Sequence, residues 1–364
     1  MIARHLCDLI GLDFPSALMV GAGRYTIMIK GVRKHRSLLI YCAVTFVILS
    51  LFSLLSFLLL RYSNFAPFAF VRAQLVATAM TTYSHQYIAR IVATESEIEA
   101  IMDDVLRGFG ELDAKSAIQY IEIAEELGCT EGFTQLEYGV YVREISRFGF
   151  VGKLMLILDP SRVIIGTADV LGEQPATVKS MVESHGAIAG INGGWFSGYS
   201  PTGFVITGGQ RVYPVYPLAE YYPSDNIMVG FTWENILVMG LFTEQEAHAM
   251  GIRDSLSTYP VLILNGEPQI TVGDGGWGIA PRTAIAQRED GAILFLAIDG
   301  RQWHSMGATL RQVQDALLEN NAHNAMALDG GSSTAMYHRG VYLNSPALGF
   351  ERSVPTSFLV KPVD

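Results

Sequence analysis

The chain has 364 residues, of which 50% are hydrophobic and 16% are charged, and its formal net charge is −10. A mean hydropathy of +0.28 excludes an ordinary soluble protein unless one segment carries the excess of apolar residues. Beyond residue 60 the chain contains 33 acidic and 19 basic side chains, and this acidic balance argues against nucleic acid as a partner.

One apolar run accounts for the high hydropathy. Residues 37–60 include no charged side chain, and a helix of 24 residues is about 36 Å long, which is enough to cross a bilayer. A basic cluster between Lys30 and Arg36 precedes this run, whereas Arg61 alone follows it closely. Because basic residues stay on the cytoplasmic side, we predict a single-pass plasma-membrane protein with residues 1–36 in the cytoplasm and the main domain outside. A cleaved signal peptide is the alternative, but its apolar region normally has only roughly 7–15 residues.

Residues 61–134 are predicted to form a helical stalk or collar between the membrane and the main domain. The second expected helix begins with a capping-box pattern, in which Glu99 follows Ser96 by three residues. The alternative is that these helices pack on the main domain and have no separate role. The predicted helices are Ala73–Val92, Glu95–Leu106 and Ala117–Leu127.

From residue 135 to residue 364 the pattern changes to short apolar runs separated by turn residues, which is typical of strands. We therefore predict a strand-rich α+β domain with a mixed α/β sheet over residues 135–364, and a short helix at Thr177–Ser184. The predicted strands are Tyr138–Glu144, Lys153–Leu158, Arg162–Gly166, Ala187–Ile191, Phe204–Ile206, Ile236–Met239, Val261–Leu264, Thr283–Gln287, Ile293–Ile298, Met326–Leu328, Met336–Tyr337 and Ser357–Val360.

Three of the apolar runs end in a polar residue followed by glycine. A helical pattern after Thr309 separates the last two of them, and a strand–helix–strand unit of this length places its strands parallel. Their carboxyl ends then meet at one edge of the sheet, where ligands bind in α/β proteins. We expect Asp299 and Asp329 to share this edge and Asn192 to join them. The alternative for Asp329 is a hairpin turn in which the carboxylate caps its own loop.

A glycine-rich segment at residues 272–284 is predicted to form a loop over this site. Trp277 in the loop could offer an apolar face to a sugar. The planar fork of Arg282 suits phosphate or carboxylate, and a surface salt bridge is its alternative role. Arg352 is a second, weaker candidate for anion binding.

The sequence implies no cofactor with certainty. Asp299 and Asp329 could hold a divalent cation, because hard cations need only oxygen ligands. No Cys or His pair has the spacing of a metal site. Ser332 and Ser333 lack a G-x-S-x-G elbow and an obvious paired histidine, so we expect them to support the site and not to act as nucleophiles.

Four motifs recur at the ends of the predicted strands: INGGWF at 191–196, PRTAIA at 281–286, AIDGRQ at 297–302 and LDGGSST at 328–334. They resemble those of the phosphodiester glycosidase family, and their order and spacing fit over residues 135–362. The N-terminal anchor and helices look like those of bacterial membrane-tethered members. Two departures concern the substrate pocket: Ser332-Ser333 stands where many relatives have a third glycine, and Trp195 stands where Phe or Gly is common.

The resemblance implies a hydrolase that cleaves the sugar–phosphate bond of glycosyl-1-phosphodiesters in cell-envelope or exopolysaccharide glycans. The leaving group is a weakly basic phosphate monoester, so it needs charge neutralisation, a role for Arg282 with Arg352 as helper. The anomeric carbon develops positive charge, and a carboxylate must stabilise it or activate water. We expect Asp329 to be that carboxylate with Asp299 as its partner, and Asn192 to bind the sugar or orient water. The expected substrate-binding residues are Gly193, Gly194, Thr283, Gly330, Gly331, Ser332, Ser333, Trp277 and Arg352.

Other classes of function remain as alternatives. A non-hydrolytic glycan-binding or exopolysaccharide-assembly module could use the same residues without chemistry. A glycosyl transferase could use the same carboxylates and pass the sugar to an acceptor hydroxyl. A structural membrane adaptor is disfavoured, because it would not need glycine-flanked polar residues at three strand ends.

Overall fold

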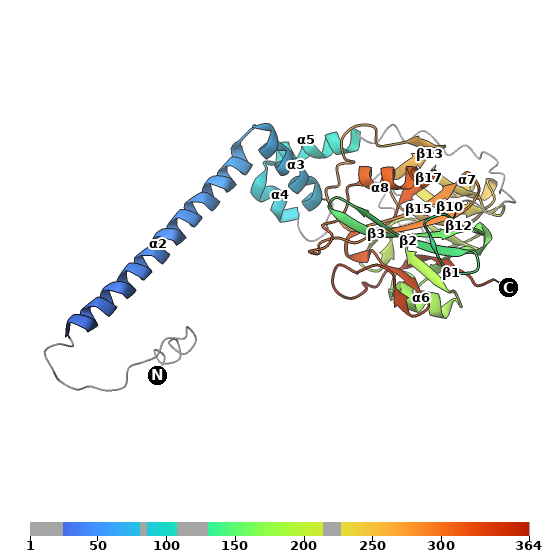
Figure 1. The fold of residues 1–364 in the computed structure, drawn as a ribbon. Helices are drawn as coiled ribbons and strands as arrows, with labels where there is room; N and C mark the ends of the chain where they lie inside the picture. Colours follow the sequence, from blue (N-terminus) through green and yellow to red (C-terminus); the bar gives the residue numbers. More distant parts are fainter. Residues whose placement is uncertain (1–24, 81–85, 108–129, 214–226, 364) are drawn as a thin grey trace. The chain divides into compact units, whose positions relative to one another are not determined.

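The computed structural model describes residues 25–80, 86–107, 130–213 and 227–363. The chain divides into two compact units, Met1–Phe68 and Ala69–Asp364. Figure 1 shows the elements of both in chain order. Each unit is considered by itself below.

The first unit contains one long helix, α2 (Tyr25–Tyr62). Its segment Tyr41–Tyr62 has 22 residues and a mean hydropathy of 2.6, and is long and apolar enough to cross a membrane. The predicted span, residues 37–60, overlaps this segment. A helix of this kind is compatible with a single-pass anchor or with a signal sequence.

Three short helices follow along the chain: α3 (Ala66–Met80), within which the second unit begins, α4 (Gln86–Val92) and α5 (Glu95–Arg107). The predicted capping box was wrong by two residues. Thr94 caps α5, because its hydroxyl accepts from the backbone N–H of Glu97 at 3.3 Å while the Glu97 carboxylate accepts from the backbone N–H of Thr94 at 2.7 Å. The third predicted helix, Ala117–Leu127, lies outside the described residues.

Three antiparallel sheets and a two-stranded ribbon build the rest of this unit. The large sheet has the order β1-β2-β3-β16-β15-β17-β13-β14, with bounds Thr134–Glu137, Val140–Arg147, Phe150–Ile157, Ile293–Ile298, Arg282–Arg288, Ala322–Ala327, Val261–Leu264 and Glu267–Pro268. The second sheet has the order β11-β10-β12-β8-β9, with bounds Leu237–Leu241, Ile227–Thr232, Ile252–Ser257, Val205–Thr207 and Gln210–Tyr213. The third sheet has the order β19-β18-β5-β20-β4, with bounds Val341–Tyr342, Met336–His338, Ala189–Asn192, Thr356–Val360 and Val163–Thr167. The ribbon pairs β6 (Phe196–Ser197) with β7 (Ser200–Pro201).

The α+β class is confirmed, but the expectation of a parallel pair in a mixed sheet was wrong. Strand β15 lies between β16 and β17 and pairs antiparallel with both. Strands β16 and β17 therefore run in the same direction without touching, and their carboxyl ends still lie at the same edge of the sheet. The helix between them crosses over one intervening strand, which strand–helix–strand spacing cannot reveal.

The middle strands are buried on both faces. Every residue of β15, β16 and β17 is buried. Their side chains belong to one large core that also includes residues of the third sheet, such as Phe358 of β20. Burying one large aliphatic side chain stabilises a fold by roughly 1.5–3 kcal/mol, so this core fixes the strand ends that carry the polar residues.

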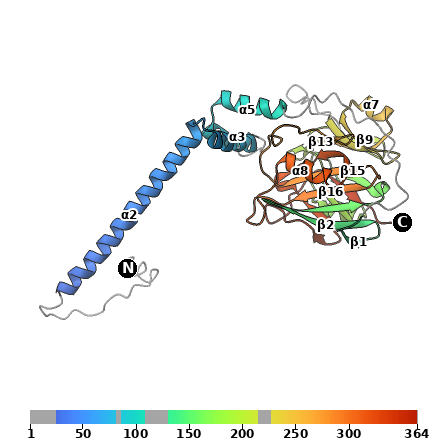
Figure 2. The ribbon, with the colours of Figure 1, turned by 45° about the horizontal axis from the view of Figure 1, so that its top comes forward.

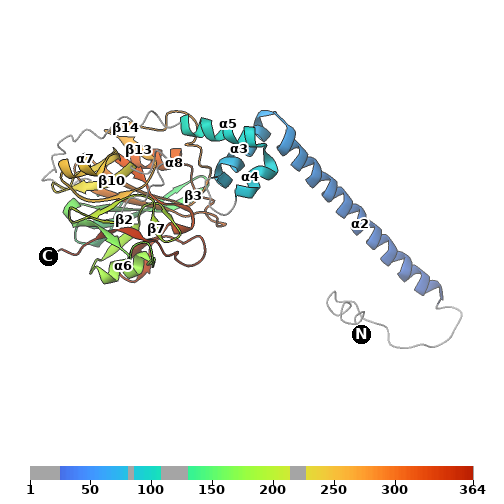
Figure 3. The same cartoon turned by 180° about the vertical axis from the view of Figure 1, so that it is seen from behind.

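Helices α6 (Val178–Ser184) and α8 (Leu310–Leu318) lie on opposite sides of the strands (Figure 1, Figure 3). Helix α8 begins at a capping box of Thr309 and Gln312. Its buried stripe packs on β13, β15 and β17, and Figure 2 shows the helix beside β13 and β15. The third helix, α7 (Glu244–Ala249), is capped in the same way by Thr243 and packs against β12.

Candidate active site

Asp329 stands where the chain leaves the large sheet. Leu328 donates its backbone N–H to Thr283 at 2.8 Å, and Asp329 donates to the carbonyl of Gly193 at 3.1 Å. The next strand, β18, belongs to the third sheet, so this segment is a passage between two sheets. The hairpin of the alternative was wrong, although the Asp329 carboxylate does cap its own turn. The turn needs glycine: a Cβ on Gly330 would lie 2.8 Å from the carbonyl oxygen of Pro281, and Gly331 has φ +63°.

The Asp329 carboxyl group has an unusual environment. It accepts hydrogen bonds from the Ser333 hydroxyl and the Gly330 N–H, and the Arg352 cation lies nearby; all three lower its pKa. Burial has the larger, opposite effect, and the pKa of Asp329 is raised to about 6. The group therefore changes its charge in the near-neutral range, which is useful for a catalytic carboxylate.

Asn192 holds the backbone of Asp329. Its amide nitrogen donates to the Asp329 carbonyl at 2.6 Å. Its amide oxygen accepts from the Thr283 hydroxyl at 2.8 Å and from the backbone N–H of Ala335 at 3.1 Å. The side chain is fully buried, and these bonds join β5, β15 and both ends of the Asp329 turn.

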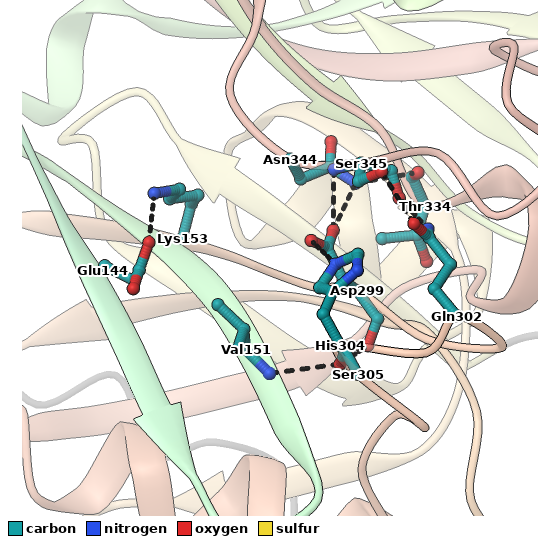
Figure 4. A network of polar contacts seen from close by, with 10 residues as sticks. All are labelled: Glu144, Val151, Lys153, Asp299, Gln302, His304, Ser305, Thr334, Asn344 and Ser345. Carbon is teal, nitrogen blue, oxygen red and sulfur yellow. Dashed lines mark hydrogen bonds and ion pairs between the residues drawn. The ribbon is translucent and has the colours of Figure 1, made fainter.

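Asp299 follows the end of β16, and a network of hydrogen bonds connects it to the same region (Figure 4). Its carboxylate accepts from the backbone N–H of Ser345 at 2.7 Å and from the Asn344 amide at 3.3 Å, and lies 3.3 Å from His304 Nε2. The Asn344 amide also donates to the carbonyl of Thr334 at 3.3 Å. The Thr334 hydroxyl lies 3.2 Å from that of Thr283, so the network reaches Asn192 and, through it, Asp329.

The link between the two carboxylates is therefore indirect. Within the described ranges, no hydrogen bond joins Asp299 to Asp329, and both oxygens of Asp299 already have protein partners. The same ranges contain no group of three or more His, Cys, Asp and Glu side chains suited to hold a metal ion. Asp299 holds the β16 loop against the 344–345 segment, and its catalytic role stays a prediction.

The two predicted arginines differ in what they contact. Arg282 is buried, and its guanidinium donates to the carbonyls of Ala308, Trp277 and Gly278 at 3.0, 2.8 and 2.6 Å. Burial, with a smaller effect of the Arg301 charge, lowers its pKa to about 10. Arg352 instead donates to Ser333 Oγ at 3.2 Å and lies over the ring of Phe196 at 4.6 Å. Arg282 thus fixes the glycine-rich loop, and Arg352 is the cation beside Asp329.

Three aromatic rings meet next to this turn. The rings of Trp195 and Trp277 are 4.8 Å apart, and Tyr259 lies 6.4 Å from the first and 5.8 Å from the second. Each ring belongs to a segment that accepts a backbone hydrogen bond from the end of β17 or from the turn at Asp329. The two tryptophans are half-buried and Tyr259 is buried, so the cluster presents tryptophan surface beside the site.

The sequence pointed to most of this constellation but missed some members. Asn344 and Ser345 lie in an irregular segment without any pattern, and only the fold shows that they hold Asp299. Arg301 was overlooked although it stands inside the AIDGRQ motif; its guanidinium lies against the Gly331 turn. Of the predicted substrate-binding residues, Ser333 contacts both Asp329 and Arg352, whereas Gly194 packs on the Ser257 backbone.

The chain is similar to several known proteins. The family model described as phosphodiester glycosidase matches residues 185–361. The chain is 29% identical to the SPbeta prophage-derived uncharacterized protein YomE of Bacillus subtilis (strain 168), over 57% of this chain and 32% of that protein. It is 27% identical to N-acetylglucosamine-1-phosphodiester alpha-N-acetylglucosaminidase of Bos taurus, over 52% of this chain and 38% of that protein. The chain thus spans about a third of the length of these relatives.

A solved structure supports the fold. The catalytic domain of zebrafish N-acetylglucosamine-1-phosphodiester alpha-N-acetylglucosaminidase, auto-inhibited by its pro-peptide, superposes with a TM-score of 0.51 at 20% identity, covering 62% of this chain and 82% of that one. At this identity the likeness concerns the fold alone. Residues 185–361 thus match the family model of the phosphodiester glycosidases, and the fold agrees with that match.

Proposed function

We propose that the protein is a membrane-anchored extracytoplasmic hydrolase that cleaves the sugar–phosphate bond of glycosyl-1-phosphodiesters in cell-envelope or exopolysaccharide glycans. The family supports a glycosidase-type hydrolase. The observation that carries the proposal is the Asp329 carboxyl group, held by Ser333 and Gly330 beside Arg352, with a pKa of about 6. The apolar segment Tyr41–Tyr62 supports the anchor.

The chemistry needs a carboxylate and a stabilised leaving group. The anomeric C–O bond breaks, and its electron pair stays on the oxygen of the departing phosphate monoester. Ionised Asp329 either stabilises the positive charge on the anomeric carbon or takes a proton from the water whose oxygen forms the new bond. The phosphate carries its own negative charge, so it leaves without a strong general acid.

Asn192 and Asp299 support this chemistry without touching the reacting atoms. Both polar atoms of the Asn192 amide are bound to protein, one of them to the carbonyl of Asp329. The Asp299 carboxylate likewise accepts hydrogen bonds from Asn344 and Ser345. We assign both a positioning role, Asn192 for the Asp329 turn and Asp299 for the loop after β16.

The first prediction concerns pH dependence. Because Asp329 acts as the ionised form, kcat/KM should rise with pH through an inflection near 6, the pKa of this group. Arg352 lowers that pKa, so Arg352→Met should move the inflection to higher pH and reduce activity more at pH 6 than at pH 8. Arg352→Lys, which keeps the charge, should move it less. A Met variant with an unshifted profile contradicts the assignment.

The second prediction concerns the sugar side. The rings of Trp277 and Trp195 give the site an aromatic surface, and stacking on such a surface contributes about 0.5–1.5 kcal/mol. Trp277→Ala should therefore raise KM roughly threefold to tenfold, with a smaller change in kcat. Trp233, an exposed tryptophan remote in sequence from the aromatic cluster, provides the matched control, and its replacement by Ala should leave KM unchanged. Equal effects of both substitutions argue against the sugar assignment.

The function itself is tested with the full-length chain in detergent. A panel of glycosyl-1-phosphodiesters that differ in sugar and in alcohol is incubated with the protein, and free sugar and phosphate monoester are quantified. Release of both supports the hydrolase. Binding without release identifies a glycan-binding module, and a new glycoside formed only with a saccharide acceptor identifies a transferase.

A further inference from the structure

Arg301 has a charge that no described residue neutralises. Partial desolvation lowers the pKa of this guanidinium although the residue is exposed at the surface. Among the described residues near the site, Arg301 forms no ion pair with a carboxylate. The nearby Asp299 pairs with His304, three residues after Arg301. Arg301 is exposed, so an anion from solvent can reach its guanidinium, whose planar fork suits phosphate or carboxylate.

The backbone holds Arg301 in a fixed position. Its φ is +59°, a region that costs a residue with a Cβ roughly 1 kcal/mol or more. The backbone N–H of Arg301 donates to the carbonyl of Met306 at 3.0 Å, and reciprocal bonds between Gln302 and Ser305 close the loop. The Ser305 hydroxyl donates to the carbonyl of Asp299 at 2.6 Å, which ties this loop to the end of β16 (Figure 4). Strain retained in a rigid loop points to a functional constraint on the side chain.

The guanidinium lies against the turn that carries the catalytic carboxylate. A Cβ added to Gly331 would lie 3.5 Å from Arg301 Nη2 and 3.8 Å from Nη1. Gly331 is two residues after Asp329. Because Gly331 has no side chain, the Arg301 guanidinium has room beside this turn.

The side chain of a second arginine borders the same turn. A Cβ on Gly330 would lie 3.8 Å from Cδ of Arg282, and the charge of Arg301 lowers the pKa of Arg282. Arg282 uses Nε and Nη2 to bind carbonyls, and within the described chain its Nη1 donates to no acceptor. Two like charges are thus brought together at Gly330 and Gly331, and an anion between them would relieve the repulsion.

We propose that Arg301, assisted by Nη1 of Arg282, binds the phosphate oxygens of the substrate and then those of the phosphate monoester that leaves. The planar fork of a guanidinium matches two phosphate oxygens. Arg352, which donates to Ser333 Oγ, serves the carboxylate instead. This inference rests on the proposed function, because it places the phosphate next to the anomeric carbon that Asp329 faces.

The test measures phosphate binding apart from turnover. Inorganic phosphate is titrated into the full-length chain and followed by calorimetry and ³¹P NMR, with acetate as a second anion. We expect saturable phosphate binding by the wild type, at least about tenfold weaker binding by Arg301→Met, and partial recovery in Arg301→Lys, since a bidentate charged contact is worth about 1.5–3 kcal/mol. The matched control is Arg211→Met on β9, which removes an exposed arginine paired with Glu244 and should leave phosphate binding unchanged.

The outcomes separate this inference from the proposed function. Absence of phosphate binding by the wild type, equal binding by Arg301→Met, or equal weakening by Arg211→Met each overturns the role of Arg301. If phosphate binding depends on Arg301 but the protein hydrolyses no sugar phosphodiester, the anion site is supported and the hydrolase function is contradicted. If hydrolysis is found, competitive inhibition by inorganic phosphate should weaken in Arg301→Met by the same factor as binding.

Discussion

Asp329→Asn is expected to lower the release of sugar from a glycosyl-1-phosphodiester by at least about a thousandfold, because an amide neither stabilises an adjacent positive charge nor accepts a proton from water. The same change should stabilise the fold near pH 8. Burial raises the pKa of Asp329 to about 6, so ionisation costs free energy and stability falls as pH rises from the unfolded value through 6. The neutral amide removes this cost, roughly 1–3 kcal/mol, since one pKa unit corresponds to about 1.4 kcal/mol.

Initial rates and thermal unfolding at pH 5 and pH 8 check both parts. The gain in stability should be larger at pH 8 than at pH 5. Asp299→Ala is the contrasting variant: Asn344 and Ser345 both donate to the same oxygen of Asp299, so its removal leaves two donors without their acceptor and should destabilise the protein at both pH values. Near-normal turnover by Asp329→Asn would contradict the account of the site.

Asn192→Ala is expected to destabilise the fold by about 3 kcal/mol and to reduce kcat strongly in the protein that still folds. The substitution removes three hydrogen bonds of a fully buried side chain, and each buried group left without a partner costs about 1–3 kcal/mol. The Asp329 carbonyl is one of those groups, so the turn loses its position relative to β5. Denaturant unfolding and steady-state kinetics measure the two effects.

A matched variant separates position from burial. Asn324 is also a buried asparagine of the large sheet, and its amide oxygen accepts from the backbone N–H of Asn265 at 2.8 Å, near the start of β17. Asn324→Ala should cost about 1 kcal/mol of stability and leave kcat unchanged. An equal loss of kcat in both variants would show that Asn192 acts through general stability and not through Asp329.

The sequence predicted which edge of the sheet carries the site, but it did not predict which strands are neighbours. The apolar runs before Asp299 and Asp329 predicted strands, and β16 and β17 do end at the same edge. Period-2 and helical patterns describe one element at a time. They cannot show that β15 separates the two strands, because that pairing depends on contacts distant in sequence.

The roles of individual side chains were harder to predict than their location. Arg282 could equally serve a substrate or the fold until the loop carbonyls of Trp277 and Gly278 were placed around it. Asp299 looked like a partner for Asp329 because both follow apolar strands and precede glycine. Its actual partners, Asn344 and Ser345, lie in a segment whose sequence has no periodicity. Motif spacing thus identified the region, and the hydrogen bonds distinguished Asp329 from Asp299.

The bond that breaks provides the most direct test of the central claim, that Asp329 promotes attack at the anomeric carbon. Hydrolysis of a glycosyl-1-phosphodiester by the full-length chain is carried out in H₂¹⁸O, and both products are analysed by mass spectrometry. The account predicts ¹⁸O at the anomeric carbon of the released sugar and none in the phosphate monoester. Label in the phosphate would show cleavage of a P–O bond and contradict the account.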